Sequence, residues 1–266
     1  DQNYEFGDGP RLSGDRKEEF YTFLLVGRDT GGGGNTDTLM VMAYDIPNQT
    51  LNVMSIPRDT MVNVSWDIKR INSVYNYAPY YDKDGIQFLK EEVSYLIGFQ
   101  PDYTIVVEWE AVGELVDAIG GVYYDVPLDM DYKDPAQDLY IHVKEGPQWL
   151  SGKEAVGVMR FRKGYANADI GRIGTQQDFM MTVAQQILAN KDDLNLGDLV
   201  NIFLNYVETD LSYGEIIWLA QEFYKTDSEN IQFELMPGNY NDSVNRTSYV
   251  TILVDEWLEM VNKSLN

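Results

Sequence analysis

The feature that most restricts how this chain can fold is a set of three short apolar runs between residues 23 and 59, each ending in turn-forming or charged residues. The first run, Phe23–Val26, leads into Gly27-Arg28-Asp29 and then into four consecutive glycines. Two more apolar runs follow at 39–42 and 51–56, and the last one ends at Pro57-Arg58-Asp59. Short apolar runs bounded by turn signals are typical of buried strands. The segment therefore predicts three strands, with a glycine-rich loop between the first and the second.

Two aspartates flank this loop, and an arginine follows the third predicted strand. Asp29 and Asp37 are eight residues apart, and because glycine tolerates positive φ, the loop between them can fold back and bring both carboxylates to one point. Two oxygen ligands beside an open loop suit Mg²⁺, which leaves its other positions to water and phosphate. Arg58 could bind phosphate oxygens with its planar fork. Spacing alone supports equally well a solvated loop whose aspartates cap turns.

Composition narrows the class of protein. The chain has 266 residues, 44% of them hydrophobic and 24% charged, which is typical of a soluble globular protein with a sizeable core. Its net charge of −23 argues against nucleic acid and against a broadly basic lipid-binding face. The absence of cysteine excludes a disulfide framework and a thiolate metal site. The sequence contains no stretch of about 18 apolar residues, the length that a membrane-spanning helix needs.

Along the chain, predicted strands alternate with predicted helices, which indicates an α/β fold. We expect a three-layer α-β-α sandwich around a mixed central sheet. Residues 1–19 are predicted to be a flexible lead-in and 20–266 a single catalytic domain with a helical C-terminal extension. The chain begins at Asp1, so a membrane anchor is expected to have been removed upstream. A strand is predicted at 61–66, mostly loop at 127–147, a long helix at 173–188 and a final helix at 249–265.

A cluster of arginines forms the second informative stretch. The chain contains nine arginines, and three of them, Arg160, Arg162 and Arg172, lie within thirteen residues. Arg172 and Gln176 are four residues apart and share a face if they begin the long helix. A helix N-terminus beside guanidinium groups is a site for anions. The alternative is surface ion pairing, since 43 acidic side chains offer partners. Together with Arg58 and the two aspartates, the arginines would surround a diphosphate.

Seven short motifs in order carry a resemblance to a known family. They are Gly27-Arg28-Asp29, Thr36-Asp37-Thr38, Ser55-Ile56-Pro57-Arg58-Asp59, Arg70-Ile71-Asn72, Gly120-Gly121-Val122, Arg160-Phe161-Arg162, and Asp169-Ile170-Gly171-Arg172 with Gln176. Each motif is weak alone, but the succession over about residues 20–190 resembles the LytR-CpsA-Psr family of cell-wall glycopolymer ligases.

This resemblance implies an enzyme that takes an anionic glycopolymer from a polyprenyl-diphosphate carrier and joins it to peptidoglycan through a phosphodiester. It implies Mg²⁺ on Asp29 and Asp37, an apolar tunnel for the prenyl tail, and anchoring at the extracytoplasmic face of the bacterial membrane. The residues that match the diphosphate-binding set are Arg58, Arg70, Arg160, Arg162, Arg172 and Gln176. The expected catalytic residues are Arg58 and Arg172, with Asp59 or Asp169 orienting them or acting as base. Alanine at Arg58 or Arg172 is expected to remove transfer and to leave folding intact.

The chain departs from the family pattern at three positions. Asn35 stands where arginine is usual, Arg70 stands for a lysine, and Thr175 stands for an arginine just before Gln176. Two lost positive charges could weaken diphosphate binding or alter the choice of acceptor.

Two alternatives to the ligase therefore stay open. A prenyl-diphosphate hydrolase would use the same residues with water as acceptor, so that only product analysis separates the two. A non-catalytic module that binds lipid-linked intermediates would retain lipid and show no chemistry.

His142 is the only histidine and is interpreted as structural. The many tyrosines and tryptophans could line a sugar-binding face, although most are expected in the core or at its edges.

Overall fold

A six-stranded sheet forms the centre of the computed structural model, which describes residues 17–28 and 36–265 and, of Ala168, the backbone alone. The strand order is β10-β3-β2-β1-β4-β9. These strands are β1 (Phe20–Arg28), β2 (Thr36–Asp45), β3 (Thr50–Ile56), β4 (Tyr103–Glu108), β9 (Val207–Thr209) and β10 (Ile231–Leu235). β1 pairs antiparallel with β2 and parallel with β4, so the sheet is mixed, as predicted.

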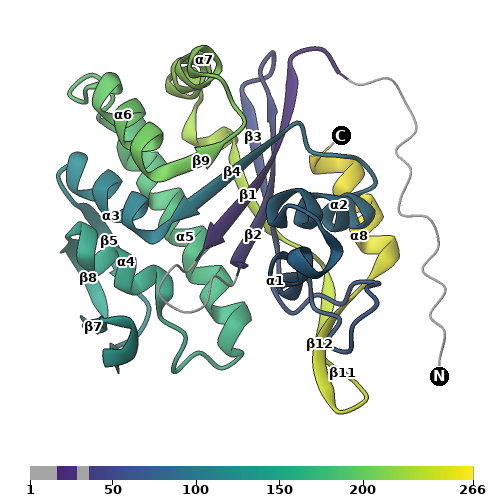
Figure 1. The fold of residues 1–266 in the computed structure, drawn as a ribbon. Helices are drawn as coiled ribbons and strands as arrows, with labels where there is room; N and C mark the ends of the chain where they lie inside the picture. The colour runs from purple at the N-terminus through teal and green to yellow at the C-terminus, as the bar shows by residue number, and fades with distance from the viewer. Residues whose placement is uncertain (1–16, 29–35, 266) are drawn as a thin grey trace.

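Helices cover both faces of this sheet (Figure 1). One face carries α1 (Val74–Tyr77), α2 (Gly85–Ile97) and α8 (Val254–Ser264). The other carries α3 (Trp109–Ala118), α5 (Ala168–Ala189), α6 (Leu196–Tyr206) and α7 (Tyr213–Lys225), with α4 (Gly152–Arg160) packed against α3 and α5. Short 3-10 turns complete the chain as η1 (Ile71–Ser73), η2 (Ala78–Tyr81), η3 (Pro135–Gln137) and η4 (Ser228–Asn230). The three-layer α-β-α arrangement expected from the sequence is confirmed.

The central strands are apolar without interruption because both of their sides are buried. Side chains alternate across a strand, so Leu24 and Val26 of β1 pack with the α1, α2 and α8 layer, whereas Phe23 packs with α6 and α7. A strand covered on both faces has no solvent side to keep polar. For this reason the run at 23–26 predicted a buried strand correctly.

Local predictions failed in three other segments. Residues 61–66 form no strand; Thr60 and Met61 make only isolated bridges, to Val250 and Arg70. The segment expected to be mostly loop holds β6 (Met130–Asp134), β7 (Leu139–Val143) and β8 (Gly146–Leu150), with β8 paired to β5 (Val122–Val126). β6 and β8 carry few apolar residues and so give a weak strand signal, whereas β7 alternates buried and more exposed side chains, as a half-buried strand does.

The predicted final helix was wrong over its first five residues. β11 (Gly238–Val244) and β12 (Thr247–Ile252) form a hairpin, and α8 begins only at Val254. The two residues of the turn, Asn245 and Arg246, both have positive φ, as a tight hairpin turn of this kind requires. The run Val250-Thr251-Ile252 is β-branched and favours a strand over a helix.

Helix α5 starts five residues earlier than the predicted position, at Ala168. Its first turn therefore contains Asp169, and Arg172 lies three residues further along the same face.

Among the described residues, no helix combines the length and the apolar character needed to cross a membrane. Most of the predicted lead-in lies outside the described residues, as do Asp29 and Asn35.

Candidate functional site

The register between two strands explains why Asp37 and Arg58 meet. β2 and β3 run antiparallel, with Leu39 opposite Ile56. Two residues further along each strand, Asp37 therefore comes opposite Arg58, and Arg58 Nη1 lies 3.2 Å from Asp37 Oδ1. The sequence prediction that these strand ends form one site is thus supported by the geometry.

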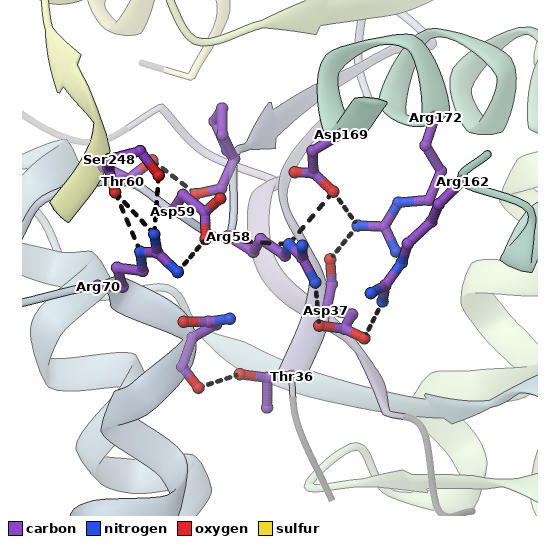
Figure 2. A network of polar contacts seen from close by, with 12 residues as sticks. Thr36, Asp37, Arg58, Asp59, Thr60, Arg70, Arg162, Asp169, Arg172 and Ser248 are labelled. Carbon is purple, nitrogen blue, oxygen red and sulfur yellow. Dashed lines mark hydrogen bonds and ion pairs between the residues drawn. The ribbon is translucent and has the colours of Figure 1, made fainter. Parts of the chain in front are cut away.

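Asp37 is the centre of a network of arginines drawn from three parts of the chain (Figure 2). Arg162, just after α4, makes a short hydrogen bond to the other carboxylate oxygen, Oδ2. Arg172 of α5 donates from Nη2 to the backbone oxygen of Asp37 at 2.9 Å. The Asp37 side chain is 8% exposed, so these guanidinium groups replace most of the water that the carboxylate loses on burial.

Asp169 joins two of these arginines from the first turn of α5. Its Oδ1 lies 2.7 Å from Arg172 Nη2 and 3.3 Å from Arg58 Nε (Figure 2). A single carboxylate oxygen therefore fixes both guanidinium groups relative to each other. This contact supports the orienting role considered for Asp169.

A second, smaller network holds Arg70 to one side of the first. Arg70 Nη1 lies 3.5 Å from Asp59 Oδ1, and Arg70 donates from Nη2 to the backbone oxygen and hydroxyl of Ser248 at 2.8 and 3.0 Å. Asp59 also approaches Arg58 Nε at 3.9 Å and so links the two networks. Ser248 of β12 was missed in the sequence because a helix was predicted to begin at the next residue, so no strand was expected here. The β-branched run after it was the signal that could have revealed the strand.

For two residues of the expected diphosphate set, the structure describes contacts outside the Asp37 network. Arg160 is the last residue of α4 and donates to Gln137 Oε1 at 3.2 Å. Gln176 is fully buried, with its amide nitrogen donating to the Met159 backbone oxygen at 2.9 Å and its amide oxygen accepting from Thr38 Oγ1 at 3.4 Å. Thr175, which replaces a family arginine, is buried beside it in α5. The direct binding role predicted for Arg160 and Gln176 stays a prediction.

The exposure of the arginines divides them into two groups. The side chains of Arg162, Arg58 and Arg70 are 41%, 24% and 27% exposed, so they can contact a ligand, whereas that of Arg172 is 1% exposed. Arg172 Nε is buried and has no hydrogen-bond partner among residues 17–28 and 36–265. We infer that Arg172 mainly holds Asp37 and Asp169 in place from behind.

The electrostatics of the cluster favour an anion even though the chain is strongly acidic. Three guanidinium groups, those of Arg58, Arg162 and Arg172, face the carboxylates of Asp37 and Asp169 and leave one positive charge in excess. Burial lowers the pKa of Arg58, but the carboxylates around it outweigh burial and hold that pKa above its usual value. Burial lowers the pKa of Arg172, although a buried guanidinium still keeps its proton. The N-terminus of α5 adds a partial positive charge.

The expected metal pair is described only in part, because Asp29 and the glycine loop lie outside the described residues. Both carboxylate oxygens of Asp37 accept from a guanidinium, yet an ionised carboxylate offers about four lone-pair sites, so positions for Mg²⁺ remain. Within the described part of the chain, no group of three or more acidic, histidine or cysteine side chains is arranged to hold a metal. Asp37 therefore fits as one of a small number of carboxylate ligands.

Replacing Gln176 with leucine is expected to lower the free energy of unfolding by about 1–3 kcal/mol, because the Met159 carbonyl and the Thr38 hydroxyl would lose a buried partner. Urea denaturation measures this change, and Gln232→Leu, at an exposed position on β10, is the matched control. A Gln176→Leu protein of unchanged stability that had lost diphosphate binding would instead indicate direct contact with the ligand.

Known proteins resemble this chain in sequence. TagV of Bacillus subtilis (strain 168), named a polyisoprenyl-teichoic acid–peptidoglycan teichoic acid transferase, is 27% identical over 230 residues, which are 85% of this chain and 58% of TagV. The regulatory protein MsrR of Staphylococcus aureus (strain COL) is 28% identical over 226 residues, which are 83% of this chain and 66% of MsrR. The chain thus spans less than two thirds of the length of either relative.

Solved structures show the same fold, and a family model shows the family. The crystal structure of B. subtilis TagV is similar with a TM-score of 0.72 and 26% identity, covering 94% of this chain and 97% of that one. The structure of TagT bound to LI-WTA has a TM-score of 0.70 at 18% identity, covering 97% and 95%, which is a likeness of fold. The model of the LytR_cpsA_psr family matches residues 3–266. The chain therefore belongs to the LytR_cpsA_psr family.

Proposed function

We propose that this protein is a phosphotransferase that moves an anionic glycopolymer from a polyprenyl-diphosphate carrier to peptidoglycan through a phosphodiester bond. The observation that carries the proposal is the arginine cluster around Asp37, whose excess positive charge, in a chain of net charge −23, would attract a diphosphate. The name of TagV as a teichoic acid transferase supports the same reaction. MsrR is named a regulatory protein, but a buried cluster of paired arginines and carboxylates favours anion chemistry.

An apolar cavity supports a lipid-linked donor. It has a volume of about 320 Å³ and lies between the sheet and helices α6 and α7, with Phe23, Met42, Phe203 and Ile216 among its lining residues. Thr38 and Met42 are on the same side of β2, and Thr38 contacts α5. At about 3.4 Å per residue, Met42 is about 17 Å from Asp37 along the strand. A prenyl tail in this cavity would extend past the buried side chain of Met40, whose flexibility can make room.

In the proposed reaction, a sugar hydroxyl of peptidoglycan attacks the phosphorus that carries the glycopolymer. A new bond forms from the hydroxyl oxygen to phosphorus, and the bond from that phosphorus to the bridging oxygen breaks. The bridging oxygen leaves with its electron pair as part of polyprenyl phosphate. Arg58 and Arg162, the more exposed members of the cluster, stabilise the negative charge on the phosphoryl oxygens.

The proton of the attacking hydroxyl requires an acceptor, and Asp59 and Asp169 are the candidate bases. Each also lies within ion-pair distance of Arg58, so each can orient that arginine. We propose Mg²⁺ as the cofactor, held by Asp37 and, from the sequence, by Asp29. When bound there, it would add positive charge next to the phosphoryl oxygens. We further propose that the enzyme acts at the extracytoplasmic face of the bacterial membrane, to which an N-terminal anchor would tether it.

Incubation of the pure protein with a synthetic polyprenyl-diphosphate sugar and Mg²⁺, with and without a peptidoglycan oligomer, tests the proposal. Mass spectrometry should show a sugar phosphodiester on the oligomer, formed only when Mg²⁺ is present. Free sugar phosphate produced equally without the oligomer would identify a hydrolase instead. Intact lipid that remains bound through purification, with no product under any condition, would identify a binding module.

A further inference from the structure

Five aromatic side chains form a continuous group beside α1. They are Trp66, Tyr77, Tyr80, Tyr81 and Phe88, called here the aromatic platform. The rings of Trp66 and Tyr77 are stacked nearly parallel, with centroids 4.4 Å apart and an angle of 3°. Tyr80 packs against Tyr77 at 5.8 Å, and Tyr81 packs against both Trp66 and Phe88 at 5.5 and 5.7 Å. The contacts therefore run from ring to ring across the whole group.

The platform is rigid at its base and exposed at its surface. Trp66 is buried and donates from Nε1 to Ser73 Oγ at 2.9 Å, and the hydroxyls of Tyr81 and Ser65 share a short hydrogen bond. Tyr80 is 82% exposed, Tyr81 44% and Tyr77 36%. Clustered exposed apolar surface of this kind marks an interaction site, whereas single exposed apolar residues are ordinary.

The platform lies directly beside the arginine network. Asn72 connects the platform to the arginine network. Its backbone N–H donates to the Arg58 backbone oxygen at 3.1 Å, and its backbone oxygen accepts from Thr36 Oγ1 at 3.4 Å. Tyr77 is five residues further on, about 8 Å at the rise of a helix. Ser73, the next residue after Asn72, accepts from Trp66.

The aromatic platform and the apolar cavity lie on opposite faces of the sheet. Trp66 and Phe88 pack in the layer of α1, α2 and α8, whereas the cavity lies under α6 and α7 (Figure 1). Phosphoryl transfer places the attacking and leaving oxygens roughly in line on opposite sides of phosphorus. If the prenyl phosphate leaves on the side of the cavity, the acceptor hydroxyl must approach from the side of the platform.

We propose that the aromatic platform binds the glycan strand of the peptidoglycan acceptor, with a pyranose ring stacked on Tyr80 and Tyr77. This inference rests on the proposed function. The apolar C–H face of a pyranose can pack on an aromatic ring while its hydroxyls stay in water, and tyrosine offers the same combination of an apolar body and a polar end. The five platform residues carry no charge, and the nearby cation of Lys83 is paired with Glu91. An anionic donor polymer would need cations to bind it, and the platform, whose five residues the structure describes, offers no unpaired one. The platform therefore suits the glycan of the acceptor.

Titration calorimetry with a soluble, uncrosslinked peptidoglycan glycan oligomer tests the platform without turnover. Tyr80→Ala is expected to raise the Kd of the wild-type protein about tenfold or more, as loss of an aromatic anchor does. Tyr80→Phe should keep most of the affinity, because it retains the ring. Tyr213→Ala, at another tyrosine that is 61% exposed, is the matched control and should bind like the wild type. Equal affinity of Tyr80→Ala and wild type, or a wild type that binds no glycan, would overturn the proposal.

Transfer kinetics separate the acceptor from the donor. Tyr80→Ala should raise the KM for the glycan oligomer and leave kcat and the KM for the lipid-linked donor unchanged. A rise in the donor KM alone would show that the platform holds the donor polymer and would overturn the assignment. A protein that binds glycan through Tyr80 but forms no phosphodiester would refute the proposed function and retain the platform, so the two failures are distinguishable.

Discussion

Replacing Arg172 with glutamine is expected to lower the free energy of unfolding by about 3 kcal/mol, the usual result of removing one partner from a buried ion pair. The side chain is 1% exposed and holds both the Asp169 carboxylate and the Asp37 backbone oxygen. Its removal leaves Asp169 with the weaker contact to Arg58 at 3.3 Å. Urea denaturation measures the loss. The burial of this residue changes the expectation from sequence that its removal would leave folding intact.

Arg172→Lys separates the effect on activity from the effect on stability. Lysine keeps the positive charge but cannot donate to Asp37 and Asp169 from one planar group. We expect a smaller loss of stability than in Arg172→Gln and a loss of transfer of about 100-fold, comparable to removing one preorganised donor. Arg246→Gln, at an exposed position in the β11–β12 turn, is the matched control. An Arg172→Gln protein as stable as the wild type would contradict the supporting role assigned to Arg172.

Replacing Asp37 with asparagine is expected to reduce transfer by about 100- to 1000-fold while the protein stays folded. The substitution keeps the shape of the side chain but removes the charge that positions Arg58 and Arg162. Because the cluster then becomes more positive, metal-free binding of inorganic pyrophosphate should be retained or become tighter. The part of the affinity that depends on Mg²⁺ should disappear, since an amide is a poor ligand for that ion compared with a carboxylate.

Calorimetric titration of pyrophosphate with and without Mg²⁺ measures both components for Asp37→Asn. Asp192→Asn, an exposed carboxylate beyond the C-terminus of α5, is the control for loss of one negative charge. Retention of the full Mg²⁺ effect in Asp37→Asn would exclude this aspartate as a metal ligand. Its role would then be limited to orienting the arginines.

The sequence by itself determined the class of fold and predicted an anion site. Buried strands read as apolar runs, so β1, β2 and β3 were recognisable from local pattern. The concentration of arginine near Asp169 in an acidic chain, together with the ordered motifs, identified the family before any contact was known. These signals are local, and each is contained in a short segment.

Only the tertiary structure decided which of these residues meet. Arg160 and Arg162 are two residues apart, yet α4 ends at Arg160 and Phe161 is extended, so Arg162 reaches Asp37 while Arg160 contacts Gln137. Ser248 reaches Arg70 because the pairing of β11 with β12 places it there. The contacts of Arg162 with Asp37 and of Ser248 with Arg70 join positions more than a hundred residues apart. The pairing and packing that create them depend on the whole chain.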